Sequence, residues 1–200
     1  MTPTKLVLAS SSPYRRQLLQ KLRMEFSWAS PEIDESPKEH ETPEQLVLRL
    51  AKQKATALAD IFPEHLIIGS DQIATLNNRI IGKPHTHKAA TSQLASFSGK
   101  EVVFLTSLCL YNSKTHRSQL ATDKYTVKFR QLNDRQIDSY LRQEEPYDCA
   151  GSFKSEGMGI CLFERMEGKD PNTLVGLPLI ELTDMLMNEG IDPLSFHRNH

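Results

Sequence analysis

Short apolar runs typical of buried strands alternate along this chain with segments that carry helix-start signals. Lys5 to Ala9 is such a run, and it stops at a Ser-Ser-Ser-Pro turn, after which leucines recur at helical spacing. Thr42-Pro43-Glu44-Gln45 has the form of a capping box and opens an amphipathic segment, and Leu66-Ile67-Ile68 then reads as another strand. This alternation predicts an α/β protein, because strands and helices that follow one another pack as layers.

The middle of the chain adds antiparallel pairing. Residues Glu101 to Tyr111 and Gln119 to Phe129 are rich in β-branched and aromatic residues and should pair across the polar turn between them. Asn77-Asn78 lies between two short apolar runs, as in a hairpin. We therefore expect a mixed, twisted central sheet flanked by helices, with two lobes around a cleft.

The second half supplies further elements. We expect helices over Ala89 to Phe97, from the capping box Asn133-Asp134-Arg135-Gln136 onward, and from Pro178 to a stop at Gly190. Gly157 to Phe163 is predicted as a strand. Because 200 residues suit one domain, we expect a single two-lobed domain over residues 1–200, with a polar tail from about residue 193.

Composition excludes several classes of partner. The 24 basic and 25 acidic residues leave a net charge of -1, which gives no overall attraction to nucleic acid or to an anionic membrane. No apolar stretch approaches the roughly 20 residues of a membrane span, and no signal-type segment opens the chain. Cys109, Cys149 and Cys161 are widely spaced and odd in number, so we expect reduced core thiols and a cytoplasmic protein.

The turn before the first helix could bind an anion. Three serines precede Pro13, and Arg15 and Arg16 follow it. The unpaired N–H groups at a helix N-terminus favour negative charge, so hydroxyls and guanidiniums at that end point to a phosphate. In the plainer alternative, Ser12 caps the helix and the arginines are solvated.

Two carboxylates are candidates for metal binding or proton transfer. Asp71 directly follows Leu66 to Ser70, a buried-strand pattern that we expect to end there in a polar turn, and Glu35 lies in a Pro-rich acidic loop. Ligands bind at the carboxyl ends of strands in open α/β sheets, where a carboxylate can hold a hard cation or accept a proton from water. A lone Asp after a strand is also a common turn residue, but Lys83 on the nearby Gly-Lys-Pro turn favours a site.

Other candidates are weaker when taken alone. The loop from Gly151 to Gly157 offers Lys154 and Glu156 between two glycines, a pattern that ordinary surface loops share. His85 and His87 lack a third ligand, so they do not predict a zinc site.

Taken together, seven segments resemble the Maf family of nucleotide pyrophosphatases. None is specific alone, but they occur in the family's order along nearly the whole chain. They are Leu8-Ala9-Ser10-Ser11-Ser12-Pro13-Tyr14-Arg15-Arg16, Asp34-Glu35, the helix with Lys54, Gly69-Ser70-Asp71-Gln72, Gly82-Lys83-Pro84, Gly151-Ser152-Phe153-Lys154-Ser155-Glu156-Gly157 and Asn172-Thr173-Leu174-Val175-Gly176-Leu177-Pro178.

The resemblance implies an α/β fold of the inosine-triphosphatase (Ham1-like) type and a divalent cation, Mg²⁺ or Mn²⁺. The implied reaction converts a nucleoside triphosphate to the monophosphate and pyrophosphate, with Asp71 as the catalytic carboxylate and with Asp71 and Glu35 as metal ligands. The residues it implies for the phosphates are Ser10, Arg15, Arg16, Lys54 and Lys83.

The motif versions resemble the YceF-type branch of that family, which acts on 7-methyl-GTP rather than on dTTP and UTP. Tyr14, Gln72 and Glu156 match positions associated with base choice, although position 14 is often Trp in such relatives. N7-methylation makes guanine cationic, so the ring of Tyr14 would attract it while Glu156 accepts protons from the base edge.

The predicted function is therefore metal-dependent attack of water on the α-phosphorus of 7-methyl-GTP, with Asp71 orienting or deprotonating the water. Two alternatives stay open: a non-catalytic nucleotide sensor in the control of cell division, and a pyrophosphatase that prefers dTTP or UTP. We expect a small-molecule nucleotide as partner, no nucleic acid and no membrane, and allow for a homodimer.

Overall fold

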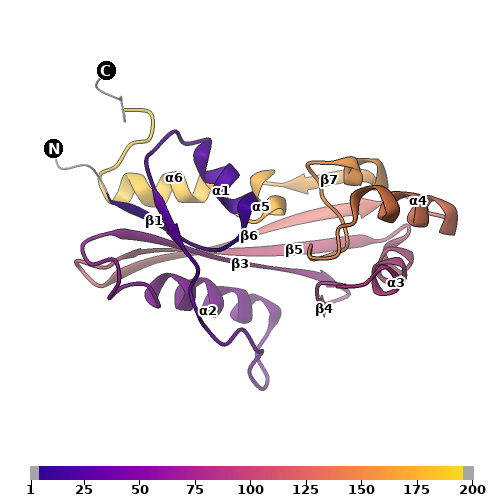
Figure 1. The fold of residues 1–200 in the computed structure, drawn as a ribbon, viewed down its shortest axis with the longest axis horizontal. Coiled ribbons are helices and arrows are strands. Elements are labelled where there is room, and N and C mark those ends of the chain that lie inside the picture. Colours follow the sequence, from indigo (N-terminus) through magenta and orange to yellow (C-terminus); the bar gives the residue numbers. More distant parts are fainter. Residues whose placement is uncertain (1–4, 196–200) are drawn as a thin grey trace.

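The computed structural model describes residues 5–195 as a mixed seven-stranded sheet with helices on its faces (Figure 1). In chain order the elements are β1 (Leu6–Ala9), α1 (Pro13–Gln20), β2 (Ser27–Ala29), α2 (Pro43–Thr56), β3 (Leu66–Leu76), β4 (Arg79–Ile81), α3 (His87–Phe97), β5 (Glu101–Asn112), β6 (Arg117–Phe129), α4 (Asp134–Glu144), the 3₁₀ helix η1 (Met158–Leu162), β7 (Phe163–Gly168), α5 (Asn172–Val175) and α6 (Leu179–Asn188).

The sheet combines parallel and antiparallel pairs, as predicted. Its strand order is β2-β1-β3-β5-β6-β7, with β4 paired to β3. β1 runs parallel to β2 and to β3, whereas β3, β5, β6 and β7 pair antiparallel. The hairpin predicted at Asn77-Asn78 joins β3 to β4. Because β1 ends at Ala9, opposite Gly69, the rest of β3 continues past it and leaves room for a site at that edge.

Helices cover the sheet on opposite faces (Figure 1). Alternate residues of β1 divide between them: Val7 and Ala9 pack toward α2, while Leu6 and Leu8 pack toward α1 and α6. A third apolar cluster fills the far end of the long strands, where α3 and α4 pack together. β3 thus meets a different cluster on each face, which is what a strand buried on both sides requires.

The helix starts follow the sequence signals. Thr42 and Asn133 each form a complete capping box with the Gln at the third helical position, and Ser12 caps α1. Helix α2 lies unusually close to β3, because a Cβ on Gly69 would lie 2.1 Å from the carbonyl oxygen of Ala51. Only glycine permits this approach.

The prediction for Gly157 to Phe163 was wrong. That segment is the 3₁₀ helix η1, and strand β7 begins at Phe163. Local hydrogen bonds explain the difference: the amide of Gly159 donates to the carbonyl of Lys154, and that of Ile160 donates to Gly157. The chain turns on itself there and cannot extend.

The prediction that a strand ends before Asp71 was also wrong. β3 runs on to Leu76 because β5 pairs with it as far as Thr75, so Asp71 is a strand residue rather than a turn residue. The cysteine prediction held only for Cys109, which is buried; Cys149 is half-buried and Cys161 is exposed, and all three are free. Of the predicted tail, residues 196–200 lie outside the described part of the chain.

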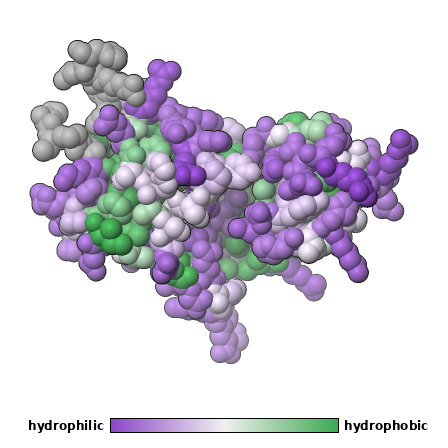
Figure 2. All heavy atoms as spheres, in the orientation of Figure 1, coloured by the Kyte–Doolittle hydropathy of each residue, from purple (hydrophilic) through white to green (hydrophobic). Residues whose placement is uncertain are grey.

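The face shown in Figure 2 carries mostly hydrophilic residues, and its apolar residues lie in separate patches. Among residues 5–195, no helix combines the length and apolar character needed to cross a bilayer.

Candidate active site

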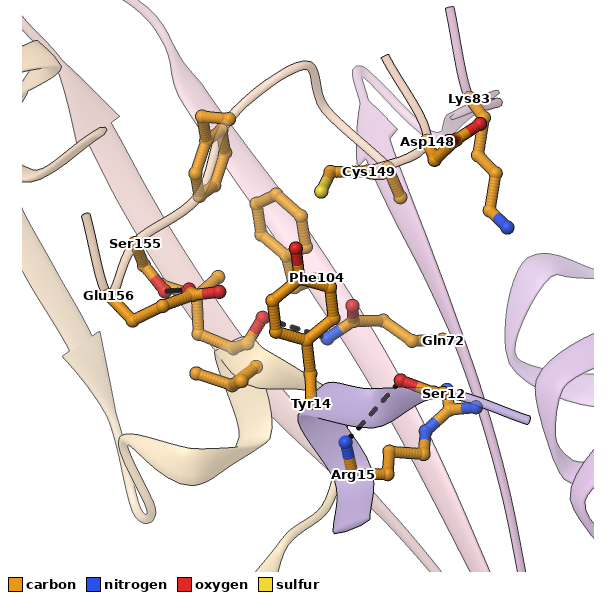
Figure 3. A pocket seen from close by; sticks show the side chains of 14 residues that line it. Ser12, Tyr14, Arg15, Gln72, Lys83, Phe104, Asp148, Cys149, Ser155 and Glu156 are labelled. Carbon is orange, nitrogen blue, oxygen red and sulfur yellow. Dashed lines mark hydrogen bonds between the residues drawn. The ribbon is translucent and has the colours of Figure 1, made fainter. Parts of the chain in front are cut away.

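A pocket of about 170 Å³ lies where α1 and α5 approach β3 and the loop that follows α4 (Figure 3). Five of the predicted site residues line it, namely Tyr14, Arg15, Gln72, Lys83 and Glu156. The remaining lining residues are Ser12, Phe104, Asp148, Cys149, Ala150, Phe153, Ser155, Leu174 and Val175.

The start of α1 supplies one wall. The Ser12 hydroxyl accepts the Arg15 backbone N–H at 3.4 Å, so the capping alternative is correct for this serine. Arg15 is not solvated, however: it is half-buried, and its Nε donates to the carbonyl of Gly176 at 2.7 Å. The cap of the plainer alternative is therefore present, but its solvated arginine is not, and anion binding at this turn stays a prediction.

Three predicted phosphate residues lie outside the pocket lining: Ser10, Arg16 and Lys54, the last of which is described with Asp71 below. Ser10 is buried, and its hydroxyl accepts the backbone N–H of Ser12 at 3.1 Å, which shapes the turn. The Arg16 guanidinium lies over the ring of Trp28, 4.8 Å from its centroid. Arg15 and Arg16 thus point in different directions, as neighbours on a helix do.

Strand β3 divides the predicted residues between its two faces. Asp71 points to α2, where its Oδ1 lies 2.6 Å from the Lys54 Nζ, and the same ammonium lies 2.9 Å from an oxygen of Glu35. Gln72 points to α5 and donates through Nε2 to the carbonyl of Thr173 at 2.7 Å. The cluster of Lys54, Asp71 and Glu35, which we call the carboxylate cluster, therefore adjoins the pocket but does not line it.

Arg15 connects the pocket with the carboxylate cluster. Burial lowers the pKa of Arg15, while the charges of Asp71 and Glu35 act in the opposite direction. Burial raises the pKa of Asp71, although Lys54 and Arg15 both lower it. A buried carboxylate with a raised pKa is a better proton acceptor than an exposed one, which suits work as a general base.

Aromatic and acidic groups form the other end of the pocket. The half-buried Tyr14 ring stands near Phe104, and Glu156 lies on the opposite side of the opening (Figure 3). Burial raises the pKa of Tyr14, with further contributions from Cys149 and Glu156, so its hydroxyl stays neutral at physiological pH. An aromatic face and a carboxylate beside cationic Arg15 and Lys83 could hold a molecule that is cationic at one end and anionic at the other.

Several residues of the pocket and its surroundings were missed from the sequence. Phe104 and Cys149 look like ordinary core residues, so nothing in their local pattern marked them. The segment from Asn172 to Pro178 was recognised as a motif without a role, and the structure supplies one. The carbonyl of Gly176 accepts from both Arg15 and Ser70, and therefore fixes α1 against β3.

Among residues 5–195, no group of three or more His, Cys, Asp or Glu side chains could hold a metal by itself. His87 instead bonds Tyr147 and Asp138 at 3.0 Å each. In the carboxylate cluster, two acidic oxygens converge on the ammonium of the buried Lys54. Mg²⁺ usually takes one or two carboxylates, with water and substrate phosphate completing its shell, so this donor set fits such an ion.

Comparison with known proteins agrees with the resemblance to the Maf family. The family described as "Maf-like protein" matches residues 5–189. The "7-methyl-GTP pyrophosphatase" of Alcanivorax borkumensis is 58% identical over 190 residues, covering 95% of this chain and 96% of that protein. The protein of the same description from Methylobacillus flagellatus is 56% identical over 187 residues, covering 94% and 97%.

The solved structure of the Staphylococcus aureus Ham1 protein resembles this chain with a TM-score of 0.54 at 13% identity, covering 93% of this chain and 100% of that chain. At this identity the likeness concerns the fold alone, and it confirms the predicted Ham1-like type.

Proposed function

The chain belongs to the Maf family, and we propose that it hydrolyses 7-methyl-GTP to 7-methyl-GMP and pyrophosphate. Two relatives that are 56–58% identical over nearly their whole length bear the name of that activity. The observation that carries the proposal is the pocket, which places the Tyr14 ring and the Glu156 carboxylate beside the cations of Arg15 and Lys83.

The base would lie at the aromatic end. The positive charge of 7-methylguanine favours the π face of Tyr14, a phenol that is neutral at physiological pH at its ordinary pKa and whose pKa burial raises further. The Glu156 carboxylate can accept hydrogen bonds from the N–H groups on the guanine edge. The Nε2 of Gln72 is already bonded to Thr106 and Thr173, so in this role Gln72 would present its amide oxygen.

The triphosphate would lie at the cationic end. Arg15 and Lys83 line that part of the pocket, and Lys54 adds a third cation in the adjoining carboxylate cluster. Charge-assisted bonds from these groups would neutralise the pyrophosphate as it leaves. Ser10 would act on the phosphates only indirectly, through the turn that it shapes.

A divalent ion, Mg²⁺ or Mn²⁺, would be held by Asp71 and Glu35. Each gives one oxygen to Lys54 in the described structure and has its second oxygen to offer a cation. When bound, the ion would polarise the phosphate and offset its charge.

The reaction needs a group that takes a proton from the attacking water. The buried carboxylate of Asp71, which Lys54 holds at 2.6 Å, would orient that water or accept its proton. Water would add to the α-phosphorus, the bond from that phosphorus to the bridging oxygen would break, and pyrophosphate would leave with that oxygen.

A cytoplasmic setting, predicted from the sequence, is part of the proposal.

The test is pyrophosphate release from a panel of 7-methyl-GTP, GTP, UTP and dTTP, with Mg²⁺, with Mn²⁺ and with a chelator. Asp71→Asn, which keeps the side chain's volume and leaves Glu35 as a carboxylate partner of Lys54, should lower the single-turnover rate by about 100-fold or more, measured at a temperature at which circular dichroism shows the variant to be folded. A rate within about threefold of the parent would contradict the role of Asp71.

The panel also separates the alternatives. Nucleotide binding, seen as a rise in Tm, without pyrophosphate release would favour a sensor and contradict the enzyme. Equal or faster hydrolysis of UTP or dTTP would contradict the substrate while keeping the reaction class.

A further inference from the structure

Glu35 is placed by a segment that has no regular structure. Residues 30–42, between β2 and α2, contain no helix or strand. The Glu35 side chain is 58% exposed, so water screens its ion pair with Lys54. Such a pair contributes little to holding the segment against α2. Fixing the backbone of each such residue costs conformational entropy, which one weak pair cannot offset.

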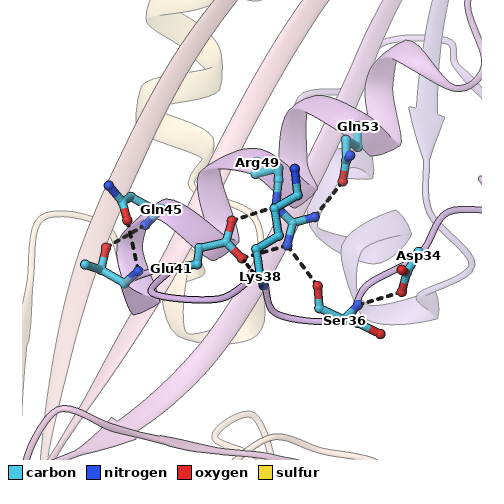
Figure 4. A network of polar contacts seen from close by, with 8 residues as sticks. Asp34, Ser36, Lys38, Glu41, Gln45, Arg49 and Gln53 are labelled. Carbon is cyan, nitrogen blue, oxygen red and sulfur yellow. Dashed lines mark hydrogen bonds and ion pairs between the residues drawn. The ribbon is translucent and has the colours of Figure 1, made fainter.

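One side chain of α2 holds the segment instead (Figure 4). Arg49 binds Glu41 through two parallel bonds, from Nε at 2.6 Å and from Nη2 at 2.7 Å. Its Nη2 also donates to the carbonyl of Ser36 at 3.0 Å, and its Nη1 donates to Gln53 at 2.8 Å. Arg49 therefore binds both Glu41, near the end of the segment, and Ser36, the residue after Glu35.

The partners of Arg49 are themselves fixed. The Glu41 side chain is only 8% exposed and also accepts the Lys38 backbone N–H at 3.0 Å. The bonds from Arg49, followed by that from Lys38, lower the pKa of Glu41 to about 2, so the pair stays charged in the physiological range. Asp34, on the other side of Glu35, accepts the Ser36 N–H at 2.9 Å and closes a turn.

Arg49 and Lys54 are on the same helix, so the group that holds the segment and the group that meets Glu35 move together. We propose that Arg49 is a positioning residue that holds residues 34–41 on α2 and thereby sets Glu35 beside Lys54 and Asp71. Its consequence for turnover rests on the proposed function, since Glu35 matters there only as a partner of the carboxylate cluster.

The first experiment measures how firmly residues 34–41 are held, from the rates of amide hydrogen exchange in the full chain. Arg49→Met keeps the apolar stem but removes the four hydrogen bonds that the guanidinium donates. The amides of Ser36, Lys38 and Glu41 should exchange at least about tenfold faster in this variant. Arg142→Met, which breaks an exposed ion pair with Asp138 on α4, should leave them unchanged. Unchanged exchange in Arg49→Met would overturn the proposal.

The second experiment asks whether the effect passes through Glu35. Arg49→Met should lower kcat for pyrophosphate release about tenfold in the parent, but less than about twofold in a Glu35→Gln background. Arg49→Lys, which keeps the charge but not the two parallel bonds, should restore little. Equal losses in both backgrounds would overturn the positioning role.

The two proposals fail separately. If the parent releases no pyrophosphate from any nucleotide, the proposed function fails, while the exchange measurement still decides whether Arg49 places Glu35.

Discussion

Lys54 and Asp71 form a buried ion pair across the contact between α2 and β3, with 2.6 Å between Nζ and Oδ1. Both side chains are 9% exposed. Taking two charges out of water is costly, so such a pair adds little to stability by itself, yet removing one partner leaves an uncompensated charge. The arrangement of the site and the stability of the fold therefore both depend on this ion pair.

Lys54→Met should destabilise the protein by about 3 kcal/mol near neutral pH, because it leaves the Asp71 carboxylate buried without its closest cation. The pKa of Asp71 is already raised by burial and should rise further without Lys54. A carboxyl whose pKa is higher in the folded than in the unfolded state binds protons more tightly when folded, so the penalty should shrink as the pH falls through that pKa.

Urea denaturation near neutral pH and near pH 5 would measure this change. Lys114→Met, which breaks an exposed pair with Glu64, is the matched control and should cost less than about 0.5 kcal/mol. A penalty for Lys54→Met that grows toward lower pH would contradict the sign of the Asp71 shift.

The contact that brings Lys54 to Asp71 depends on Gly69. Gly69→Ala would place a methyl group 2.1 Å from the Ala51 carbonyl, on helix backbone that cannot yield locally. We expect a loss of about 3 kcal/mol in unfolding free energy, at the upper end for an overpacked site. Gly82→Ala meets nothing within 4 Å and should change stability by less than about 0.5 kcal/mol. Similar unfolding midpoints for the two variants would show that α2 can shift away from β3.

Local signals predicted most of the fold. The boxes at Thr42 and Asn133 form as expected, because capping depends on residues within one turn. The error at Gly157 has a different origin: an apolar run with two glycines fits a strand or a tight helix equally well, and contacts with Lys154 and Glu144 decide between them. Both partners lie outside the apolar run, so the periodicity of the run does not reveal these contacts.

The sequence predicted which residues gather at the site better than it predicted where their side chains point. Residues that belong to motifs, such as Tyr14 and Glu156, meet in one pocket although they are distant in sequence. The different directions of Arg15 and Arg16 depend on where Gly176 and Trp28 lie, which the sequence does not reveal. Whether the chain divides into two lobes stays a prediction, and so do the roles of the individual site residues.

The different contacts of Arg15 and Arg16 predict different effects when each is replaced by alanine. Arg15→Ala should raise KM for the hydrolysed nucleotide about tenfold or more, because a charge-assisted bond to phosphate is worth about 1.5–3 kcal/mol. Arg16→Ala should change KM by less than about twofold, since its guanidinium lies over Trp28, outside the pocket lining. Steady-state kinetics at two salt concentrations would check both, and a larger effect for Arg16 would mean that it leaves Trp28 when substrate binds.

Substrate choice should depend on the charge of Glu156. This carboxylate faces the pocket beside the neutral ring of Tyr14, so the two together favour a cationic base with N–H groups on its edge. Thymine and uracil are uncharged and would turn acceptor carbonyls toward Glu156 with no proton between them. We expect kcat/KM for 7-methyl-GTP to exceed that for GTP, UTP or dTTP by at least about tenfold, which corresponds to about 1.4 kcal/mol of discrimination.

Glu156→Gln keeps the size of the side chain but removes its charge, and should narrow that gap mainly by slowing hydrolysis of the methylated substrate. Glu164→Gln is the matched control, because it makes the same substitution at an exposed carboxylate of β7 that does not line the pocket, and it should leave the ratio within about twofold. A ratio that Glu156→Gln leaves intact would place the discrimination in the aromatic wall alone, and Tyr14→Leu would then be the variant that abolishes it.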